Sequence, residues 1–409
     1  MERSIKIKVK LTKSQEILCD KIFGDLRYVY NKYIEVNRNF YDIEKGFCDG
    51  YLFSILWNHA LKPDWFISGC SKAVKDEIMM AEKAYKRFFK TKKGFPRFKS
   101  KHNPVQSMFF VKNGIRLNED KRHVWIPILH WVKLCEKNYL KENMIPYITG
   151  GRVIKTTNGY FLKFTLKDYP QKIRFNSSKV TKGIGIDLGI KSYALVSDIN
   201  MIDPFSVQSP ILSERYKILD YWIDKYNQAI SNKVNWNFIN HGYDISRGYP
   251  KFLKKGDATE IYNSHNILKL RKRINKLKYQ KQCMMEDFIK QLCVCLVRTK
   301  PEYITIEDLS NQYMSQSKFS TLNKHLTESR FRYFREFLTW KCKEYGIELR
   351  IANKYYPSSR MCSCCGHVKD KPLSLKTRTY KCKHCGLMLD RDLNAAINLA
   401  KCKNFTLAV

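Results

Sequence analysis

The sequence predicts a multidomain α+β protein, in which a β-barrel-like domain with a helical insertion precedes an α/β domain that contains a four-cysteine metal ribbon. Three observations predict this fold. Short alternating apolar runs flank stretches of helical periodicity in the first 180 residues. Apolar strands that end in carboxylates follow them, and two C-x2-C pairs lie close to the C-terminus. A length of 409 residues also fits two or three folding units better than one.

The composition predicts a folded protein with a polyanionic partner. The chain has 75 Lys and Arg against 38 Asp and Glu, a net charge of +37, and 44% apolar residues. The apolar fraction argues against disorder, and so large a positive charge favours nucleic acid over a merely solvated basic surface. No stretch reaches the roughly 18 to 20 apolar residues of a membrane span, and the first residues do not resemble a secretory signal. Most of the 14 cysteines lack framework spacing, so we expect a soluble, cytoplasmic protein with reduced thiols.

The β domain is predicted from residues 1–10 and 100–180, with the helical insertion at 11–99. A strand at 5–9 precedes a helix whose Thr12 and Gln15 resemble a capping box and whose apolar positions are Ile17, Ile22, Leu26, Val29 and Tyr33. A second helix is expected at 71–90. Alternating runs at 107–111, 123–128 and 152–166 predict strands, with Asn158 and Gly159 as a two-residue hairpin turn.

Basic and aromatic residues alternate between 88 and 101, after the second predicted helix. This pattern suits a nucleic-acid strand, whose bases stack while its phosphates pair with cations. The alternative is a loop that its phenylalanines anchor to the core. The candidate nucleic-acid contacts in and beside this run are Arg87, Lys90, Lys92, Lys93, Arg97 and Lys99.

Three carboxylates are the candidate catalytic residues. Asp187 ends an apolar strand before a glycine turn, Glu307 ends a second apolar strand, and Asp392 begins an apolar helix. This layout is typical of an RNase H-like core, in which carboxylates hold two divalent ions about 4 Å apart for phosphodiester hydrolysis. Oxygen ligands of this kind suit Mg²⁺ or Mn²⁺.

Each carboxylate alone has another interpretation. Asp187 would also fit the phosphate-binding turn of an actin-like ATPase, but no further glycine-rich phosphate loop follows. Glu307 alone would fit a surface acid at a strand end. We expect Asp390 to be the helix N-cap rather than a metal ligand.

Four cysteines have the spacing of a structural zinc ribbon. They form C-x2-C-x16-C-x2-C, and each pair is followed by a glycine, Gly366 or Gly386. A site with four protein ligands is closed, so this zinc is expected to be structural. Cys364, His367 and His384 are nearby alternatives. The predicted ligands are Cys362, Cys365, Cys382 and Cys385. Because the ribbon directly precedes Asp392, we expect it to rest on the carboxylate site and control access to it.

Six ordered motifs resemble the TnpB (OrfB-type) proteins of bacterial insertion sequences, which are related to the compact type V CRISPR effectors. They are "LRYVYNKYIE", "AYKRFFKTKKGFPRFKSK", "GIGIDLGIKSYA", "ITIEDLS", "YYPSSRMCSCCG" and "YKCKHCGLMLDRDLNAAINLA". The resemblance implies an RNA-guided DNA endonuclease that binds a non-coding guide RNA, recognises a short motif beside double-stranded target DNA and cuts at one RuvC-like site. Asp187, Glu307 and Asp392 fall on the family's catalytic positions and the four cysteines on its zinc ligands. We expect one protein for each RNA.

The resemblance also implies a domain layout. It makes the β domain WED-like and the helical insertion REC-like, and it divides the RuvC-like nuclease into 181–310, a helical part at 311–355, and 389–409 after a zinc ribbon at 356–388. The stretch between the first two acids fits the family less well, so no contacts are transferred to it.

A second basic run, 268–281, is predicted to be a helix lining the RNA or heteroduplex channel. Its apolar positions are Leu268, Leu270, Ile274 and Leu277, and its candidate contacts are Lys269, Arg271, Lys272, Arg273, Lys276 and Lys278. Because such proteins recognise nucleic-acid backbone and shape, they need many dispersed cations. Three alternatives stay open: a compact CRISPR effector, an unguided RNase H-like transposase or nuclease, and a guided DNA-binding repressor. The three intact carboxylates argue against the repressor.

Overall fold

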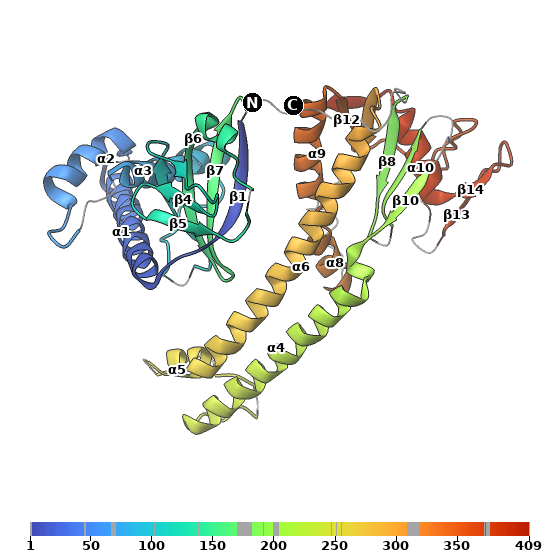
Figure 1. Ribbon diagram of the computed structural model, residues 1–409. Coiled ribbons are helices and arrows are strands. Elements are labelled where there is room, and N and C mark those ends of the chain that lie inside the picture. Colours follow the sequence, from blue (N-terminus) through green and yellow to red (C-terminus); the bar gives the residue numbers. More distant parts are fainter. Residues whose placement is uncertain are drawn as a thin grey trace. The chain divides into compact units, whose positions relative to one another are not determined.

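The computed structural model divides the chain into two compact units, Met1–Gln171 and Lys172–Val409, and each unit has its own sheet and helices (Figure 1). It describes residues 2–44, 46–66, 71–101, 103–137, 139–169, 182–190, 192–198, 204–246, 248–250, 252–254, 256–308, 320–371, 373 and 377–408. The mixed α and β composition predicted from the sequence is confirmed. No helix within these ranges is both long enough and apolar enough to cross a membrane.

The first unit is built on a seven-stranded antiparallel sheet with the order β2-β6-β7-β1-β5-β4-β3. Its strands are β1 (Glu2–Lys10), β2 (Gln106–Val111), β3 (Arg116–Leu117), β4 (His123–Ile126), β5 (His130–Leu134), β6 (Ile148–Thr156) and β7 (Gly159–Lys167). The first strand pairs with both β7 and β5, so it lies inside the sheet. The helices therefore fall, in chain order, between strands of one sheet.

The helices of this unit are α1 (Lys13–Glu44), α2 (Gly50–Leu56) and α3 (Ser71–Thr91). The predicted capping box is confirmed, because the Gln15 N–H donates to the Thr12 hydroxyl at 3.3 Å and the Thr12 N–H donates to the Gln15 side chain at 3.0 Å. One apolar position was wrong: Ile17 is 69% exposed and lies outside the buried stripe of α1. The α2 helix was not predicted.

The β6–β7 hairpin was predicted correctly, but its turn lies one residue earlier than expected. Thr156 pairs with Gly159, so Thr157 and Asn158 are the loop residues. Gly159 is the first residue of β7, and its φ of +104° belongs to a backbone region that favours glycine. The glycine therefore begins the returning strand and is not the second loop residue.

The second unit has a six-stranded sheet with the order β10-β9-β8-β11-β12-β15. Its strands are β8 (Ile184–Leu188), β9 (Ser192–Asp198), β10 (Phe205–Gln208), β11 (Tyr303–Ile306), β12 (Glu348–Ala352) and β15 (Phe405–Leu407). The three strands β8, β11 and β12 are parallel, whereas β9, β10 and β15 are antiparallel to their neighbours. A separate two-stranded ribbon joins β13 (Thr379–Lys381) to β14 (Met388–Asp390).

Six helices within the described residues accompany this sheet, from 7 to 34 residues long. They are α4 (Glu214–Asn240), α5 (Asp257–Asn263), α6 (His265–Arg298), α8 (Ser320–Ser329), α9 (Phe331–Tyr345) and α10 (Arg391–Ala400). Figure 1 shows α4 and α6 as a long pair that extends away from the sheet. The predicted helix at 268–281 is part of α6, but its apolar face was wrong in part. Ile267 and Ile274 are buried, whereas Leu268 is 47% exposed.

Helix α10 packs so closely on β8 that only glycine fits at position 185. A Cβ atom there would lie 2.0 Å from the Ala396 carbonyl oxygen and 2.4 Å from the Ala400 nitrogen. These are backbone atoms, so the helix itself would have to move. We expect Gly185→Ala to lower the free energy of unfolding by about 2 kcal/mol, because the clash displaces α10 from the sheet.

Denaturant unfolding measures this effect. Gly24→Ala is the control, because a Cβ on that α1 glycine would meet only the Arg27 side chain, at 3.8 Å. Alanine is the better helix former, so the control should not be destabilised. Equal stability of the two variants would contradict the close packing of α10.

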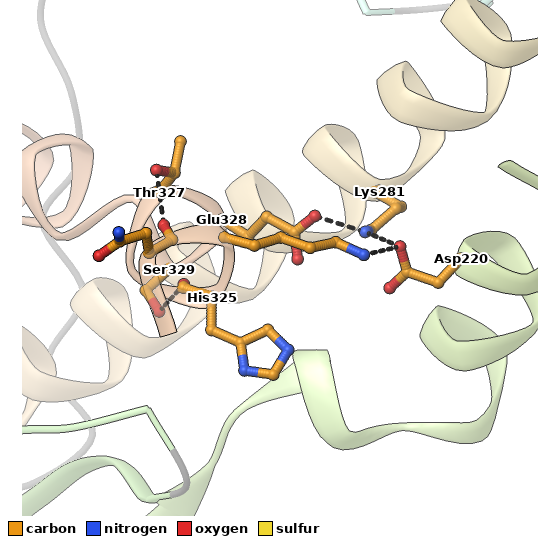
Figure 2. A network of polar contacts seen from close by, with 8 residues as sticks. Asp220, Lys281, His325, Thr327, Glu328 and Ser329 are labelled. Carbon is orange, nitrogen blue, oxygen red and sulfur yellow. Dashed lines mark hydrogen bonds and ion pairs between the residues drawn. The ribbon is translucent and has the colours of Figure 1, made fainter. Parts of the chain in front are cut away.

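A partly buried ion-pair network joins α4, α6 and α8 (Figure 2). The Lys281 ammonium is 2.7 Å from Asp220 and 2.6 Å from Glu328, and it lies 4.2 Å from the ring centre of Tyr216. The Lys281 side chain is only 6% exposed, and Lys324 also pairs with Asp220 at 2.8 Å. Removing Lys281 leaves the partly buried Glu328 carboxylate without this cation, whereas Asp220 keeps Lys324.

We therefore expect Lys281→Ala to lower the free energy of unfolding by about 3 kcal/mol. Lys278→Ala is a matched control on the exposed surface of the same helix, and it should change stability by less than about 0.5 kcal/mol. Chemical denaturation of both variants measures the difference. Similar values would show that the network adds little to stability.

Candidate functional site

The pairing of two parallel strands brings Asp187 and Glu307 together. Ile186 of β8 is opposite Ile306 of β11, and each carboxylate is the next residue along its strand. The two side chains therefore lie at the carboxyl ends of neighbouring parallel strands. Proteins with open α/β sheets commonly place their ligand sites at such an edge.

Asp392 reaches the same place from α10. Asp390, two residues earlier, is the helix N-cap: its carboxylate accepts the N–H of Asp392 at 2.9 Å and of Leu393 at 3.0 Å. The expected role of Asp390 is thus confirmed. The Asp392 carboxylate also lies 3.6 Å from the Arg378 guanidinium, which belongs to the ribbon.

The electrostatics show that the three acids influence one another. Burial is the largest cause of a pKa of Asp187 well above the usual value, and Glu307 and Asp392 raise it further by repulsion. Burial also raises the pKa of Glu307, whereas a hydrogen bond from Ser358 and the charge of Arg391 oppose this change. Negative groups in such a site favour a neighbouring cation.

The donor set fits a hard divalent cation. Carboxylate oxygens from β8, β11 and α10 are the ligands that Mg²⁺ and Mn²⁺ prefer, and the site offers neither a thiolate nor an imidazole among these three residues. The carboxylate oxygens lie farther apart than the sulfur atoms of the ribbon. In the described part of the chain, the ribbon cysteines are the one group of possible metal ligands whose ligand atoms all lie within 4.8 Å of one another.

The four ribbon cysteines have the geometry of a zinc site. Their sulfur atoms all lie within 4.8 Å of one another, with 3.6 Å between Cys362 and Cys385 and 3.7 Å between Cys365 and Cys382. Tetrahedral zinc with Zn–S bonds of about 2.3 Å separates its sulfurs by roughly 3.8 Å, whereas a disulfide requires about 2.05 Å. The predicted set of thiols is therefore brought together, and its spacing fits a metal and not disulfides.

Two similar turns present these thiols. Gly366 and Gly386, the glycines that follow the two pairs, both have φ of +74°, a conformation that favours glycine. Backbone N–H groups of Cys385 and His384 donate to the Cys382 sulfur and lower its pKa to about 6, which favours the thiolate that a metal binds. Cys364 is exposed and stands outside the cluster, and the rings of His367 and His384 stack at 5.7 Å.

The candidate nucleic-acid contacts of the first unit differ in exposure. Lys99 makes contacts within the folded unit: its ammonium pairs with the buried Glu77 and lies 4.2 Å from the Tyr30 ring centre. Its backbone N–H also donates to Asn31 at 2.7 Å. The exposed candidates are Arg87, Lys90, Lys92, Lys93 and Arg97.

The candidate contacts on α6 lie along its exposed side. Arg271 is the exception, since it is half-buried and donates to Asn263 at 2.6 Å. Arg273 lies 5.8 Å from the ring centre of Tyr226 on α4. The exposed members are Lys269, Lys272, Arg273, Lys276 and Lys278.

Three polar residues near the carboxylates were not predicted. Ser358 donates its hydroxyl hydrogen to Glu307, and Asn394 and Asn398 of α10 hydrogen-bond the ribbon backbone. A signal for the asparagines exists in the sequence: they stand four residues apart in an otherwise apolar helix, and so share one face. The prediction for this helix was based only on its apolar residues and therefore overlooked the two asparagines.

Comparisons with known proteins agree with the resemblance found in the sequence. A family described as "Cas12f1-like, TNB domain" matches residues 331–399, and a "Helix-turn-helix domain" of the OrfB IS605 type matches residues 1–45. The latter region forms one strand and one 32-residue helix in this structure rather than two helices. "Putative RNA-guided DNA endonuclease InsQ" of Escherichia coli (strain K12) is 21% identical over 93% of this chain and 87% of that protein.

Two further comparisons cover most of the chain. "Putative RNA-guided DNA endonuclease" of Streptomyces pristinaespiralis is 26% identical over 93% of this chain and 85% of that protein. Among solved structures, the Cas12f1 chain of a Cas12f1-sgRNA-target DNA complex is similar in fold, with a TM-score of 0.55, 14% identity, and coverage of 98% of this chain and 99% of that one. The chain is thus TnpB-like in sequence and shares the fold of a compact Cas12f protein.

Proposed function

We propose that the protein is an RNA-guided DNA endonuclease of the TnpB type, which binds a transposon-derived guide RNA and cleaves DNA by metal-dependent phosphodiester hydrolysis at one site. The observation that carries the proposal is the convergence of Asp187, Glu307 and Asp392 from two parallel strands and one helix. The net charge of +37 and the names of the sequence relatives support guide and target as its partners.

In this proposal Asp187, Glu307 and Asp392 hold Mg²⁺ or Mn²⁺ beside the scissile phosphate. Ions held there would supply activation of a water molecule and stabilisation of the leaving 3′ oxygen. The residues of the chain fix the carboxylates: the β8–β11 register sets the first two, and the Asp390 cap begins the helix that bears the third. The ribbon cysteines hold structural zinc next to this centre.

The domain layout follows from the same proposal. The antiparallel sheet of the first unit, at 1–10 and 100–180, acts as a WED-like domain with a REC-like insertion at 11–99. The six-stranded sheet belongs to an RNase H-like (RuvC) domain at 181–310, 311–355 and 389–409, into which a target-binding ribbon at 356–388 is inserted. The strand order, with three parallel strands between antiparallel ones, supports this assignment. The protein would act in the bacterial cytoplasm, where guide and DNA are present.

The exposed cations of α6 are expected to contact the guide RNA or the heteroduplex. Replacing Lys269, Lys272 and Lys276 with Glu makes the charge on one face of α6 more negative by six, because each substitution exchanges a positive for a negative charge. We therefore expect RNA retention to fall at least about tenfold and the salt dependence of RNA binding to weaken. Filter binding over a salt series measures both quantities. The same triple change to Gln separates charge reversal from simple loss of contacts, and undiminished RNA retention by the Glu variant would contradict this role of α6.

Sequencing the RNA that copurifies with the protein tests the proposed partner. The protein is purified from cells that carry its native locus, with Asp187→Ala as a second sample that should retain the same RNA. One discrete RNA that ends just beyond a transposon boundary supports the proposal. An RNA of repeats and spacers would indicate a compact CRISPR effector instead, and the absence of a specific RNA would favour an unguided nuclease or transposase. A guide with normal target binding but no cleavage would indicate a repressor.

A further inference from the structure

Two asparagines of α10 hold the backbone on both sides of Cys362. The Asn398 side-chain amide donates to the carbonyls of Ser358 at 2.8 Å and Met361 at 2.7 Å. The Asn394 amide donates to the same Met361 carbonyl at 2.7 Å, and its oxygen accepts the Ser363 N–H at 2.9 Å. The first zinc turn is therefore fixed directly to the helix that carries Asp392.

These contacts are fully enclosed. Asn394 is 0% exposed and Asn398 is 1% exposed, and Cys362 between the contacted backbone groups is also buried, at 1%. A buried carbonyl that loses its donor costs about 1–3 kcal/mol, because water cannot replace the bond. The turn consequently keeps one position relative to α10 as long as both asparagines are present.

Ser358 connects this turn to the carboxylate site. Its hydroxyl donates to the Oε1 atom of Glu307, and its own carbonyl is the group that Asn398 holds. Ser358 is 3% exposed, so the bond forms away from solvent. It lies four residues before Cys362, within a short segment in which the Met361 N–H donates to the Pro357 carbonyl at 2.9 Å. The folded zinc turn thus determines where the Ser358 hydroxyl points.

We propose that Ser358 is a positioning residue that couples zinc binding in the ribbon to divalent-metal binding at Glu307. Zinc holds the turn around Cys362, the asparagines hold the turn on α10, and the Ser358 hydroxyl directs one oxygen of Glu307. The inference rests on the proposed function, because it takes Glu307 as a metal ligand. Hydrogen bonds to ligating carboxylates commonly change metal affinity by about 10-fold to 100-fold.

Manganese titration of the full chain, followed by the electron spin resonance signal of free Mn²⁺, tests the coupling without a cleavage assay. We expect Ser358→Ala to keep its zinc and to weaken Mn²⁺ binding about 10-fold or more. Ser363→Ala is the matched control, because Ser363 joins the docking contacts through its backbone. It should bind Mn²⁺ as the unaltered chain does. Equal Mn²⁺ affinity in Ser358→Ala and Ser363→Ala would overturn the inference.

A double variant tests whether zinc and Ser358 act along one path. Cys382→Ser removes a zinc ligand and should weaken Mn²⁺ binding at least as much as Ser358→Ala. Adding Ser358→Ala to Cys382→Ser should then change the affinity by less than about twofold, because the hydroxyl is already misplaced. Losses that multiply would contradict the coupling. If Asp187→Ala binds Mn²⁺ as tightly as the unaltered chain, the proposed metal centre itself is wrong, which is a different failure from normal binding by Ser358→Ala alone.

Discussion

Asp187→Asn is expected to abolish DNA cleavage while making the metal-free protein more stable. Asparagine keeps the size of the side chain but removes the charge that would hold the catalytic metal. Metal stabilisation of the reaction contributes several kcal/mol, and each 1.4 kcal/mol is a factor of ten, so the rate should fall roughly a thousandfold or more. Binding of guide RNA and target should be unchanged, which gel-shift assays measure beside the cleavage assay.

The stability gain should depend on pH. Burial and the repulsion from Glu307 and Asp392 raise the pKa of Asp187 in the folded state. A carboxyl with a raised folded pKa contributes stability at low pH, and this contribution is lost as the pH rises through that pKa. The melting temperature of Asp187→Asn should therefore match that of the unaltered chain below about pH 4 and exceed it increasingly at higher pH, in metal-free buffer.

Asp390→Asn is the control for this substitution. Asparagine caps a helix about as well as aspartate, so α10 should keep its start and cleavage should continue. Loss of cleavage in Asp390→Asn together with normal cleavage in Asp187→Asn would show that the proposed assignment of the metal ligands is wrong.

Cys382→Ser is expected to remove the ribbon zinc and with it most of the cleavage activity. Structural zinc sites of this kind contribute about 10–16 kcal/mol of binding free energy, and a small ribbon depends on that energy for its fold. The zinc content should fall from one equivalent for each chain to nearly none. The ribbon should also become susceptible to proteolysis, and elemental analysis with limited proteolysis measures both effects.

Cys364→Ser is the control, because Cys364 lies in the other zinc turn, between two of the ligands, but is exposed and stands outside the cluster of four thiols. It should retain zinc and cleave normally. Loss of zinc from Cys364→Ser, with zinc retained in Cys382→Ser, would show that the ligand set is different. The antiparallel sheet of the first unit should stay folded in both variants, since it belongs to a separate compact unit.

The parts of the site with short-range signals were predictable from the sequence. The four cysteines follow from ligand spacing, and the structure brings these thiols together. The Asp390 cap and the Thr12–Gln15 capping box were also recognisable, because their partners lie within three residues. Predicting that Asp187, Glu307 and Asp392 converge required the additional assumption that two apolar strands pair in parallel. The structure shows this parallel pairing between β8 and β11.

Features that depend on distant partners were not predictable. The short strands β3 and β5 carry little alternating signal, and their place is set by pairing with β4 and β1. Helical periodicity located α1 and α6 but did not show which apolar side chains have a packing partner. Ile17 and Leu268 were therefore assigned to the buried faces, although both are exposed. Ser358 gave no signal, because its role depends on a carboxylate 51 residues away.

Programmed cleavage with two guides tests the central claim most directly. The purified protein is loaded with its own RNA scaffold carrying either of two guide sequences and is offered one DNA molecule that contains both targets beside the same flanking motif. Guided cleavage predicts that each guide moves the cut to its own target, that no cut occurs without RNA, and that Asp187→Asn cuts neither target. Cutting at the same position with both guides, or without RNA, would contradict RNA-guided recognition.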